Sequence, residues 1–541
     1  MSCSVPAVAS RFARCASAWV KASQSRSNGS EADMKDVQDA KIGIVGAGAM
    51  GQGIAQIAAM AGLEVRLMDV NPAASGRAVA AIGSILDKLA AKGKLSSEQA
   101  QEALHRIHPE DSIGALSDCD LVVEAIVEKL DVKRSLFAQL EEVVRDDAVL
   151  ASNTSSLSIT AIAATCRLPE RVAGYHFFNP VPLMKVVEVV RGLRSSDTTI
   201  DWLVSLARQL GHTAVRCRDM PGFIVNHAGR ALNTEGLCIV QEGVTDEPTV
   251  DVIVREQMGF RMGPFELLDL TGLDVSHPVM ESIYRQFYDE PRFRPSPITA
   301  IRLAGGMLGR KSGSGFYEYA DTSTMSKSIC AQGTAQWSTA PVWVSHRHPD
   351  EARRVLELLR ALDVEVETSS EPSDNALIVV TPLGHDATTC AISEELDATR
   401  VVAVDTLLGF GNGSRRVIMP TPATTEEMLT RAQALFGIDG APVSTLRDSG
   451  GFVAQRMIAC IVNTACEIAQ KRIGTPEDID AAVRLGLGYP RGPLALGDHI
   501  GASRILAVLK GLLDVYGDPR YRPGVWLSRR AELNLSLGFS D

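Results

Sequence analysis

Short apolar runs and longer segments of helical periodicity alternate through the first 217 residues of this 541-residue chain. The runs are bounded by glycine, asparagine or serine and are typical of buried strands, whereas the segments between them repeat apolar residues at helical spacing. Strands that alternate with helices in this way predict a parallel, doubly wound α/β sheet. The predicted strands are 42–45, 65–68, 120–126 and 148–151, and the predicted helices are 54–61, 72–95 and 130–145.

After residue 217 the pattern becomes one of helices only. Apolar residues recur at helical spacing over 223–242 and over 249–258, and Gly263-Pro264 places a proline where a further helix would start. This all-α region ends near Gly315-Phe316-Tyr317, before a stretch at 321–340 that is rich in serine and threonine. We therefore expect an α/β domain, an all-α domain and then a linker.

The second half of the chain repeats the first at a constant offset of 229 residues. Arg218-Asp219-x-x-Gly222-Phe223 lies over Arg447-Asp448-x-x-Gly451-Phe452. Chance does not keep one offset over so long a span, so the second half is a duplicated copy of both modules. Four further landmarks coincide at the same offset: Asp251 with Asp480, Gly263-Pro264 with Gly492-Pro493, Asp269 with Asp498, and Gly272 with Gly501.

The stretch 40–69 carries the signature of a dinucleotide-binding turn. A strand leads into Gly46-Ala47-Gly48-Ala49-Met50-Gly51 and a helix, and the next strand ends on Asp69, 18 positions after the last glycine. In a chain with 45 glycines the motif alone is weak, but this context makes it specific, against the alternative of a glycine-rich turn that binds nothing. Gly46 permits a sharp turn, Gly48 leaves the backbone open to a pyrophosphate, and Gly51 lets helix and strand pack closely. No arginine directly follows Asp69, which favours NAD over NADP.

These patterns predict six segments. They are an N-terminal extension at 1–39, a Rossmann-type NAD-binding domain at 40–217, a helical domain at 218–320, a linker at 321–340, a degenerate Rossmann-like domain at 341–444 and a second helical domain at 445–541.

A candidate general base lies in the loop that Pro180 and Pro182 stiffen. His176 and Glu188 each lie six residues from Pro182, so a chain reversal there would bring the imidazole and the carboxylate face to face. A carboxylate that holds an imidazole in one tautomer and stabilises its cation makes a general base. The alternative is a surface histidine in a loop.

Other polar residues follow the predicted strands and helices. Ligands of doubly wound sheets bind beyond the carboxyl ends of the strands, where Glu124, Glu128 and Ser155 are expected. Asn226 starts the first helix of the all-α region and would either cap it or reach into the cleft between the domains. Lys92, at the end of the helix 72–95, would be a solvated helix end or a phosphate contact.

The second copy has lost these groups. Ser345-His-Arg-His-Pro349 stands where we expect a glycine turn after the strand 342–344, and it cannot cradle a pyrophosphate. The other candidates are replaced as well: His176 by Asp405, Glu188 by Val417, Ser155 by Gly384 and Asn226 by Gln455.

Composition narrows the functional classes. A net charge of −11 argues against nucleic acid or an anionic membrane as partner, and no apolar run approaches the roughly 20 residues of a membrane span. Ten cysteines without a CxxC pair fit a reducing compartment, the cytoplasm, and no structural zinc. We interpret His105, His108, His346 and His348 as surface histidines and expect no metal.

The first 33 residues differ from the rest. They are rich in serine and alanine, contain four basic residues, and have no acid before Glu31. This composition resembles an organelle transit peptide, but translation from Met34 explains it equally well.

Taken together, Gly46–Gly51, Ser152-Asn-Thr-Ser-Ser156, His176-Phe-Phe-Asn-Pro180, Glu188 and Pro221-Gly-Phe-Ile-Val-Asn226 resemble the L-3-hydroxyacyl-CoA dehydrogenases. The resemblance covers residues 40–320 and returns in the helical part of the second half. Tandem chains with a worn second half resemble the bacterial members of phenylacetate catabolism, which act on 3-hydroxyadipyl-CoA.

The resemblance implies roles for individual positions. His176 would take the proton from the C3 hydroxyl while NAD accepts the hydride, Glu188 would pair with His176, and Ser155 and Asn226 would contact the substrate near the reacting carbon. Lys92 would lie beside the CoA phosphates. His227 departs from the family pattern, where arginine is frequent. The implied NAD contacts are Gly46, Gly48, Ala49, Met50, Gly51, Asp69, Glu128, Lys133, Ser155, Asn179 and Lys311.

The expected reaction is oxidation of a (3S)-3-hydroxyacyl-CoA to the 3-oxoacyl-CoA. The open alternatives are a 3-hydroxybutyryl-CoA or general β-oxidation dehydrogenase, a sugar-acid dehydrogenase without CoA, and a non-catalytic nucleotide-binding protein. Family members dimerise through the helical domain, so the second helical domain would act as an intrachain partner, with a homo-oligomer as the other possibility.

Overall fold

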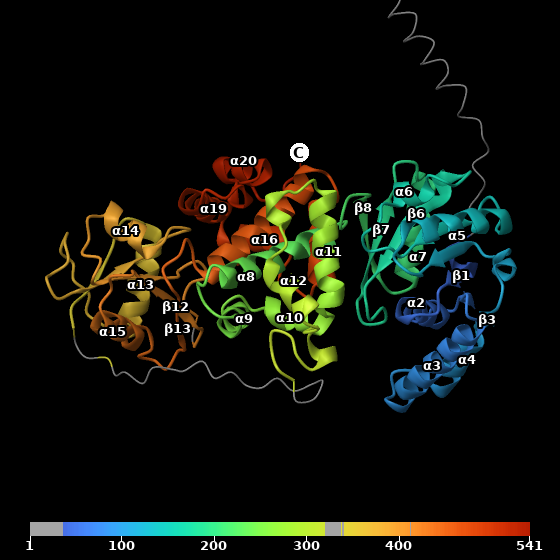
Figure 1. Ribbon diagram of the computed structural model, residues 1–541, viewed down its shortest axis with the longest axis horizontal. Helices are drawn as coiled ribbons and strands as arrows, with labels where there is room; N and C mark the ends of the chain where they lie inside the picture. Colours follow the sequence, from blue (N-terminus) through green and yellow to red (C-terminus); the bar gives the residue numbers. More distant parts are fainter. Residues whose placement is uncertain (1–35, 320–336, 338–339, 412, 541) are drawn as a thin grey trace, which may run out of the picture.

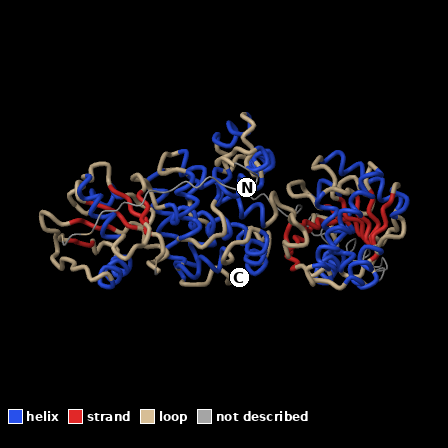
Figure 2. The backbone as a smooth tube through the Cα atoms, turned by 90° about the horizontal axis from the view of Figure 1, so that it is seen from below, coloured by secondary structure: helices blue, strands red, loops and turns tan. Residues whose placement is uncertain are grey.

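The chain folds into two α/β bodies at opposite ends of an elongated molecule, with a helical body between them (Figures 1 and 2). This computed structural model describes residues 36–319, 337, 340–411 and 413–540. The predicted fold class is confirmed. Most of the predicted extension at 1–39 and of the linker at 321–340 lies outside the described residues.

The first sheet has eight strands in the order β3-β2-β1-β4-β5-β6-β7-β8. Neighbouring strands are parallel except for β6 and β7, which run antiparallel. The central strands are apolar and buried on both faces, as the continuous apolar runs predict. The strands are β1 (Lys41–Val45), β2 (Glu64–Met68), β3 (Ile107–Glu110), β4 (Leu121–Glu124), β5 (Val149–Ser152), β6 (Val172–Phe177), β7 (Val186–Arg191) and β8 (Thr213–Arg218).

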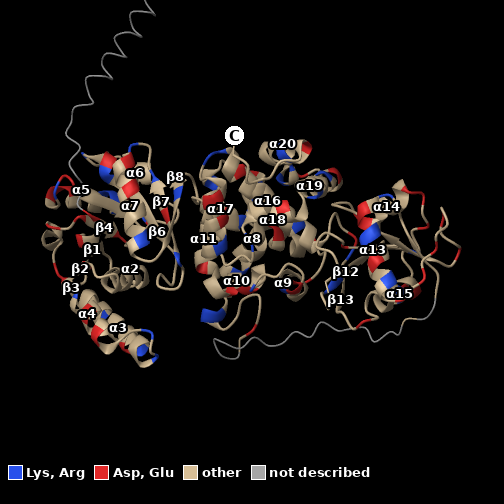
Figure 3. Ribbon diagram, turned by 180° about the vertical axis from the view of Figure 1, so that it is seen from behind, with Lys and Arg blue, Asp and Glu red and all other residues tan. Residues whose placement is uncertain are grey.

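Six helices belong to this domain, and two of them project from it as a pair, α3 and α4 (Figure 3). The predicted helix 72–95 ends at Ala91, because Lys92 and Gly93 close it before the short α4 begins at a Ser96 cap. The helices are α2 (Ala49–Met60), α3 (Pro72–Ala91), α4 (Ser97–His105), α5 (Leu130–Val143), α6 (Ile159–Ala163) and α7 (Asp197–Gln209).

The helical body contains both all-α units, packed on each other through α8 and α16. The first unit is α8 (Val225–Gln241), α9 (Glu247–Glu256), α10 (Pro264–Thr271), α11 (Leu273–Gln286) and α12 (Pro297–Ala304). The second is α16 (Val453–Gln470), α17 (Pro476–Gly486), α18 (Pro493–Ile500), α19 (Ala502–Tyr516) and α20 (Val525–Leu533).

Short 3₁₀ helices occur in the first domain and in the helical body. They are η1 (Val37–Asp39), η2 (Ile113–Leu116), η3 (Pro169–Arg171), η4 (Pro291–Phe293), η5 (Arg310–Ser312) and η6 (Pro519–Tyr521).

The second sheet is shorter, with the order β13-β12-β11-β10-β9. Its antiparallel pair β11–β12 repeats the register of β6–β7 at the 229-residue offset: Val402 faces Pro420 where Ala173 would face Arg191. The strands are β9 (Val342–Val344), β10 (Leu377–Val380), β11 (Val401–Val404), β12 (Arg416–Pro420) and β13 (Val443–Thr445), with helices α13 (Pro349–Ala361), α14 (Ala387–Ser393) and α15 (Glu426–Phe436).

One expectation about this second sheet is wrong. We matched the strand 342–344 to the strand that precedes the glycine turn, but β9 pairs with β10 at the place where β4 pairs with β5. Within the described residues, the second sheet therefore has no counterpart of β1, β2 and β3. The described part of the copy thus lacks the strands on either side of a glycine turn, and not only the glycines of that turn.

The residues that recur in both copies hold the backbone in place. Asp251 accepts hydrogen bonds from the N–H groups of Phe265 and Glu266 at the start of α10, and Asp480 does the same for Leu494 and Ala495 at the start of α18. Asp219 caps α6 and Asp448 caps α14 in the same way. The landmarks shared by the two copies are thus structural.

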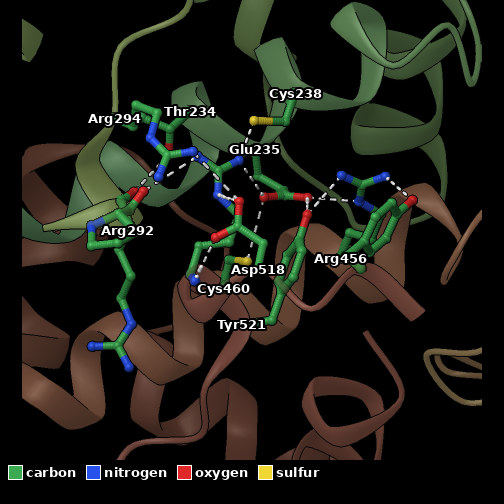
Figure 4. Close-up of polar contacts among 12 residues, drawn as sticks. Thr234, Glu235, Cys238, Arg292, Arg294, Arg456, Cys460, Asp518 and Tyr521 are labelled. Atoms are coloured by element: carbon green, nitrogen blue, oxygen red, sulfur yellow. Dashed lines mark hydrogen bonds and ion pairs between the residues drawn. The ribbon is translucent and has the colours of Figure 1, made fainter. Parts of the chain in front are cut away.

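A buried charged network joins the two helical units (Figure 4). Nε of Arg456 on α16 donates to Glu235 on α8 at 2.6 Å, and the hydroxyl of Tyr521 donates to the same carboxylate at 2.9 Å. Arg456 also bonds Glu242 at 2.6 Å. Each partner alone would be a buried, uncompensated group, so the network makes the pairing of the two halves specific.

Candidate active site

The turn between β1 and α2 has the backbone that its glycines require. Gly46 has a φ of 110°, and a Cβ there would lie 2.4 Å from the carbonyl oxygen of Ala125. A Cβ on Gly51 would lie 1.8 Å from the carbonyl oxygen of Gly46. Gly48, the N-cap of α2, has open space where its Cβ would be. The turn therefore leaves a cradle at a helix N-terminus that fits a pyrophosphate.

Asp69 lies beside this cradle. Its Oδ2 accepts the N–H of Ala47 at 2.8 Å, and its Oδ1 accepts the N–H of Asn71 at 2.9 Å. The carboxylate is thus held at the end of β2, where the acid of a dinucleotide-binding fold meets the ribose hydroxyls. Ala49 and Met50 form the first turn of α2 next to it.

His176 and Glu188 are cross-strand partners on β6 and β7. Nδ1 of His176 lies 2.6 Å from Oε2 of Glu188, and the two residues are 5% and 0% exposed. Oε1 of Glu188 accepts the N–H groups of Ile224 and Val225 at 2.8 and 2.9 Å, where α8 begins. Because both of its oxygens accept hydrogen bonds, the carboxylate keeps the ring proton on Nδ1 and leaves Nε2 as the basic nitrogen.

The loop that contains Ser155 is organised by Glu128. Oε1 of this carboxylate accepts hydrogen bonds from the hydroxyl of Thr154 at 2.7 Å and from the N–H groups of Ser155 and Ser156 at 3.0 and 3.1 Å. Burial alone would raise the pKa of Glu128, but the nearby Lys133 ammonium and these hydrogen bonds hold it below its ordinary value.

Lys133 is buried between two carboxylates. Its Nζ lies 2.6 Å from Glu124 and 3.2 Å from Glu128. Glu124, which we expected at the ligand edge of the sheet, is itself fully buried and also accepts the hydroxyl of Ser152. This carboxylate pair and its lysine fix the floor beneath the Ser155 loop.

Asn226 joins the helical body to the loop that follows β5 of the sheet. Its Nδ2 donates to the carbonyl oxygen of Ser155 at 3.2 Å, so it does not act as a side-chain cap of α8. Gln286, at the end of α11, donates to the carbonyl oxygen of Ser156 at 3.3 Å. Sequence reasoning missed Gln286, because a lone glutamine at a helix end carries no signal.

A cavity of about 750 Å³ lies between α2, α3 and the loop that contains Pro182. It begins at Ala49 and Asn179 and runs between α2 and α3 to Lys94, with apolar side chains along most of its length. Lys92 is exposed at the end of α3 and does not line it, whereas Lys94 and Lys185 do. Lys311, on η5, is exposed and forms an ion pair with Asp274.

The second copy closes the corresponding place with its own side chains. Nε2 of Gln455, the counterpart of Asn226, donates to Asp405 at 3.1 Å, and its Oε1 accepts the N–H of Gly384 at 2.9 Å. Gln455, which replaces Asn226, therefore bonds to both of the residues that replace His176 and Ser155.

Comparison with protein families decides the assignment. Residues 41–220 match the sequence model of the 3-hydroxyacyl-CoA dehydrogenase NAD-binding domain. Residues 222–319 and 451–536 both match the 3-hydroxyacyl-CoA dehydrogenase C-terminal domain. The chain belongs to the 3-hydroxyacyl-CoA dehydrogenase family. It is an NAD-dependent oxidoreductase, as the turn and the cleft predict.

Relatives in this family cover different fractions of this chain. The 3-hydroxyadipyl-CoA dehydrogenase of Escherichia coli is 37% identical over 91% of this chain and 97% of its own length. A crystal structure of 3-hydroxybutyryl-CoA dehydrogenase from the same organism has a TM-score of 0.81 at 36% identity and covers 92% of this chain and 98% of that one. A probable 3-hydroxybutyryl-CoA dehydrogenase of Deinococcus radiodurans, 43% identical, matches 52% of this chain and its own entire length. The tandem arrangement is thus shared with some members and absent from others.

The described part of this dehydrogenase offers neither a cluster of metal ligands nor a helix that could span a membrane. No group of three or more histidine, cysteine, aspartate or glutamate side chains there could hold a metal ion. None of the helices described has the length and apolar character needed to cross a membrane.

Proposed function

We propose that this dehydrogenase oxidises 3-hydroxyadipyl-CoA and that His176 is its general base. The observation that carries the proposal is the buried His176–Glu188 pair, which lies in the cleft between the glycine-turn domain and the helical body. The carboxylate holds the imidazole in the tautomer that can accept a proton at Nε2. It also stabilises the imidazolium that forms when the C3 hydroxyl gives up its proton.

Four other side chains support the alignment of substrate and cofactor. The glycine turn and Asp69 would hold NAD, which supplies the hydride acceptor when bound. Ser155 and Asn226, joined across the cleft, would position the C3 oxygen next to the imidazole. Glu128 would keep the Ser155 loop in that geometry through its hydrogen bonds. We further propose Glu128, Lys133, Asn179 and Lys311 as the remaining NAD contacts.

The cavity between α2 and α3 supports a CoA thioester as the substrate. Its apolar length suits a pantetheine arm, and Lys94 and Lys185 line it with positive charge suited to phosphates. We propose Lys92, exposed next to Lys94, as a further phosphate contact. A sugar acid without CoA would leave this cavity without a role.

The acyl group is the open part of the proposal, because the relatives' names differ. The tandem relative of E. coli that matches almost our whole chain is named for 3-hydroxyadipyl-CoA, while the similar solved structure is named for 3-hydroxybutyryl-CoA. The test is the ratio of kcat/KM for the two substrates, with the rates measured as NADH formation. We expect the higher kcat/KM for the adipyl substrate. A higher kcat/KM for the butyryl substrate would mean that the enzyme is a 3-hydroxybutyryl-CoA dehydrogenase instead.

Two further proposals concern the setting of the enzyme. The seven described cysteines are all free thiols, which supports a reducing compartment, the cytoplasm. The packing of α8 on α16 supports an intrachain pseudo-dimer, in which the second helical domain takes the place of a partner subunit.

A further inference from the structure

A buried arginine lies one helical turn beyond Asn226 on α8. The side chain of Arg230 runs back along the helix, and its Nε donates to the carbonyl oxygen of Asn226 at 3.0 Å. The residue is 8% exposed, and its Nη1 is buried without a hydrogen-bond partner. No carboxylate among the described residues forms an ion pair with it. The guanidinium is therefore an unpaired buried cation directly beside a residue of the reaction cleft.

A second buried polar group without a partner lies near this guanidinium, in the other half of the chain. Tyr489, in the loop after α17, is 4% exposed, and its hydroxyl is buried without a hydrogen-bond partner. Arg230 and Tyr489 lie close enough for each to influence the pKa of the other, yet they do not bond to each other. The guanidinium only donates, whereas the hydroxyl can donate or accept, so a ligand that brings an acceptor would satisfy both groups.

The charge of that ligand follows from the same environment. Burial lowers the pKa of Arg230 to about 10, so the side chain is still protonated at neutral pH. An isolated buried cation destabilises a fold, and replacing it with an apolar residue would relieve the cost. A carboxylate accepts two parallel hydrogen bonds from a guanidinium and pairs its charge.

The duplication provides an internal comparison. At the 229-residue offset, Arg230 corresponds to Ala459 and Tyr489 corresponds to Phe260. The rings of Phe260 and Tyr489 lie 4.6 Å apart, which places the two equivalent loops against each other. The polar groups Arg230 and Tyr489, one from each copy, thus have the apolar counterparts Ala459 and Phe260 at the equivalent place beside α16.

We propose that Arg230 and Tyr489 bind the distal carboxylate of a dicarboxylyl-CoA substrate. This inference rests on the proposed function, because it takes the C3 hydroxyl to be held by His176 and Asn226. In an adipyl chain the distal carboxyl carbon lies three carbon–carbon bonds beyond C3, roughly 4 Å when extended. Because Nε of Arg230 bonds the carbonyl oxygen of Asn226, the guanidinium lies within one helical turn, about 5.4 Å, of the residue proposed to hold the C3 oxygen. That separation is of the same order as the length of this part of the acyl chain.

The test compares 3-hydroxyadipyl-CoA with 3-hydroxyhexanoyl-CoA, which has the same length and a methyl group in place of the carboxylate. The wild-type enzyme should prefer the adipyl substrate. Arg230→Met should lower kcat/KM for the adipyl substrate by about 10²–10³-fold, mainly through KM, because it leaves a carboxylate in a buried site without its cation. The same variant should use the hexanoyl substrate better than the wild type does. Arg230→Lys should restore part of the adipyl activity.

Two further variants separate this role from a structural one. Tyr489→Phe should lower the adipyl-to-hexanoyl ratio by about tenfold, the effect of one hydrogen bond to a charged group. Arg261→Met removes an exposed arginine next to Phe260 and should leave the ratio unchanged. The melting temperature of Arg230→Met should equal or exceed that of the wild type, which shows that the variant is folded.

Each outcome has a distinct meaning. If the wild type oxidises neither substrate, the proposed function itself fails. If it oxidises both equally well, or if Arg230→Met keeps the wild-type ratio, the enzyme is a dehydrogenase but the carboxylate site is wrong. A shift of the ratio in Arg230→Met with an unshifted Arg261→Met supports the site.

Discussion

At the scale of single residues, the His176–Glu188 pair makes the sharpest prediction about catalysis. His176→Gln removes the basic Nε2 but keeps a side chain that can donate to Glu188. We expect kcat to fall by roughly 10²–10⁴-fold, the usual contribution of a general base, with little change in NAD affinity. The measurements are steady-state NADH formation and a direct titration of NAD binding.

The second copy supplies the control for this variant. Asp405 occupies the equivalent place at the end of β11, and Asp405→Asn should leave kcat within about twofold because general-base catalysis belongs to the first copy alone. Full turnover by His176→Gln would remove the imidazole from the mechanism. A loss of kcat in Asp405→Asn without unfolding would show that the second copy takes part in the chemistry.

His227 makes a prediction about stability and pH. Its ring is buried between Phe287 and Phe293 without a hydrogen-bond partner, and burial lowers its pKa to about 3. In the unfolded chain a histidine titrates near 6.5. Below that pH the unfolded state binds a proton that the folded state does not, so the free energy of unfolding should fall as the pH drops from about 6.5 towards 3, by up to about 1.4 kcal/mol per unit.

The measurement is urea unfolding of the wild type and of His227→Phe at several pH values. The phenylalanine ring keeps the packing and does not titrate, so the variant should lose this part of the pH dependence while other groups still contribute theirs. Identical slopes for the two proteins would mean that His227 becomes protonated in the folded state at the same pH as in the unfolded chain.

At the scale of elements, the three glycines of the β1–α2 turn separate folding from cofactor binding. Gly51→Ala should destabilise the fold by about 1–3 kcal/mol, because its methyl group meets the backbone of Gly46. Gly48→Ala has space for the methyl group, so it should fold normally but raise the Kd for NAD by tenfold or more where a pyrophosphate would approach. Thermal unfolding and NAD titration distinguish the two variants. The control is Gly76→Ala on α3, which should lower neither the stability nor the NAD affinity.

The elements that the sequence could predict are those whose own pattern determines them. The reversal that brings His176 opposite Glu188 followed from two apolar runs around Pro182, because antiparallel pairing needs only a short turn. Strand β3 and helix α4 could not be found in this way, since Ile107–Glu110 has no apolar run and α4 is short. The assignment of β9 failed for a different reason: a buried strand shows no sign of its neighbours, and only its pairing with β10 revealed its place.

The same limit applies to the candidate site. The spacing of Gly46, Asp69 and His176 identified the groups that carry a motif. Arg230 was overlooked although it stands four residues after Asn226, a spacing that puts two side chains on one face of a helix. Its meaning depended on Tyr489, 259 residues further along the chain, and no local pattern reports a contact across that distance.

At the scale of the whole molecule, the two copies differ in a way that separates structure from chemistry. The capping aspartates and the register of the antiparallel strand pair persist in both, whereas the glycine turn, the base and Arg230 belong to the first copy only. The second copy therefore retains what a partner subunit needs to pack and has lost what an enzyme needs to react.

Separation of the halves tests this division. A fragment of residues 34–325 exposes the face of α8 that α16 covers, so it should self-associate or aggregate, as size-exclusion chromatography with light scattering would show. A stable, fully active monomer would contradict the pseudo-dimer.

The charged network makes the expectation for that fragment more specific. In a symmetric pair of first halves, Glu235 would face His227 of the other copy, because Arg456 corresponds to His227 at the 229-residue offset. A buried carboxylate without its arginine weakens such a pair, so His227→Arg should strengthen self-association of the fragment. In the full chain, the charged groups near His227 are Glu467, Lys471 and Arg292. Glu467 is already paired with both cations, so the same substitution adds a third buried cation and should destabilise the protein by about 3–5 kcal/mol. Opposite effects of one substitution in the two contexts would show that Arg456 and Glu235 specify the pairing of the halves, and equal effects would show that packing alone does.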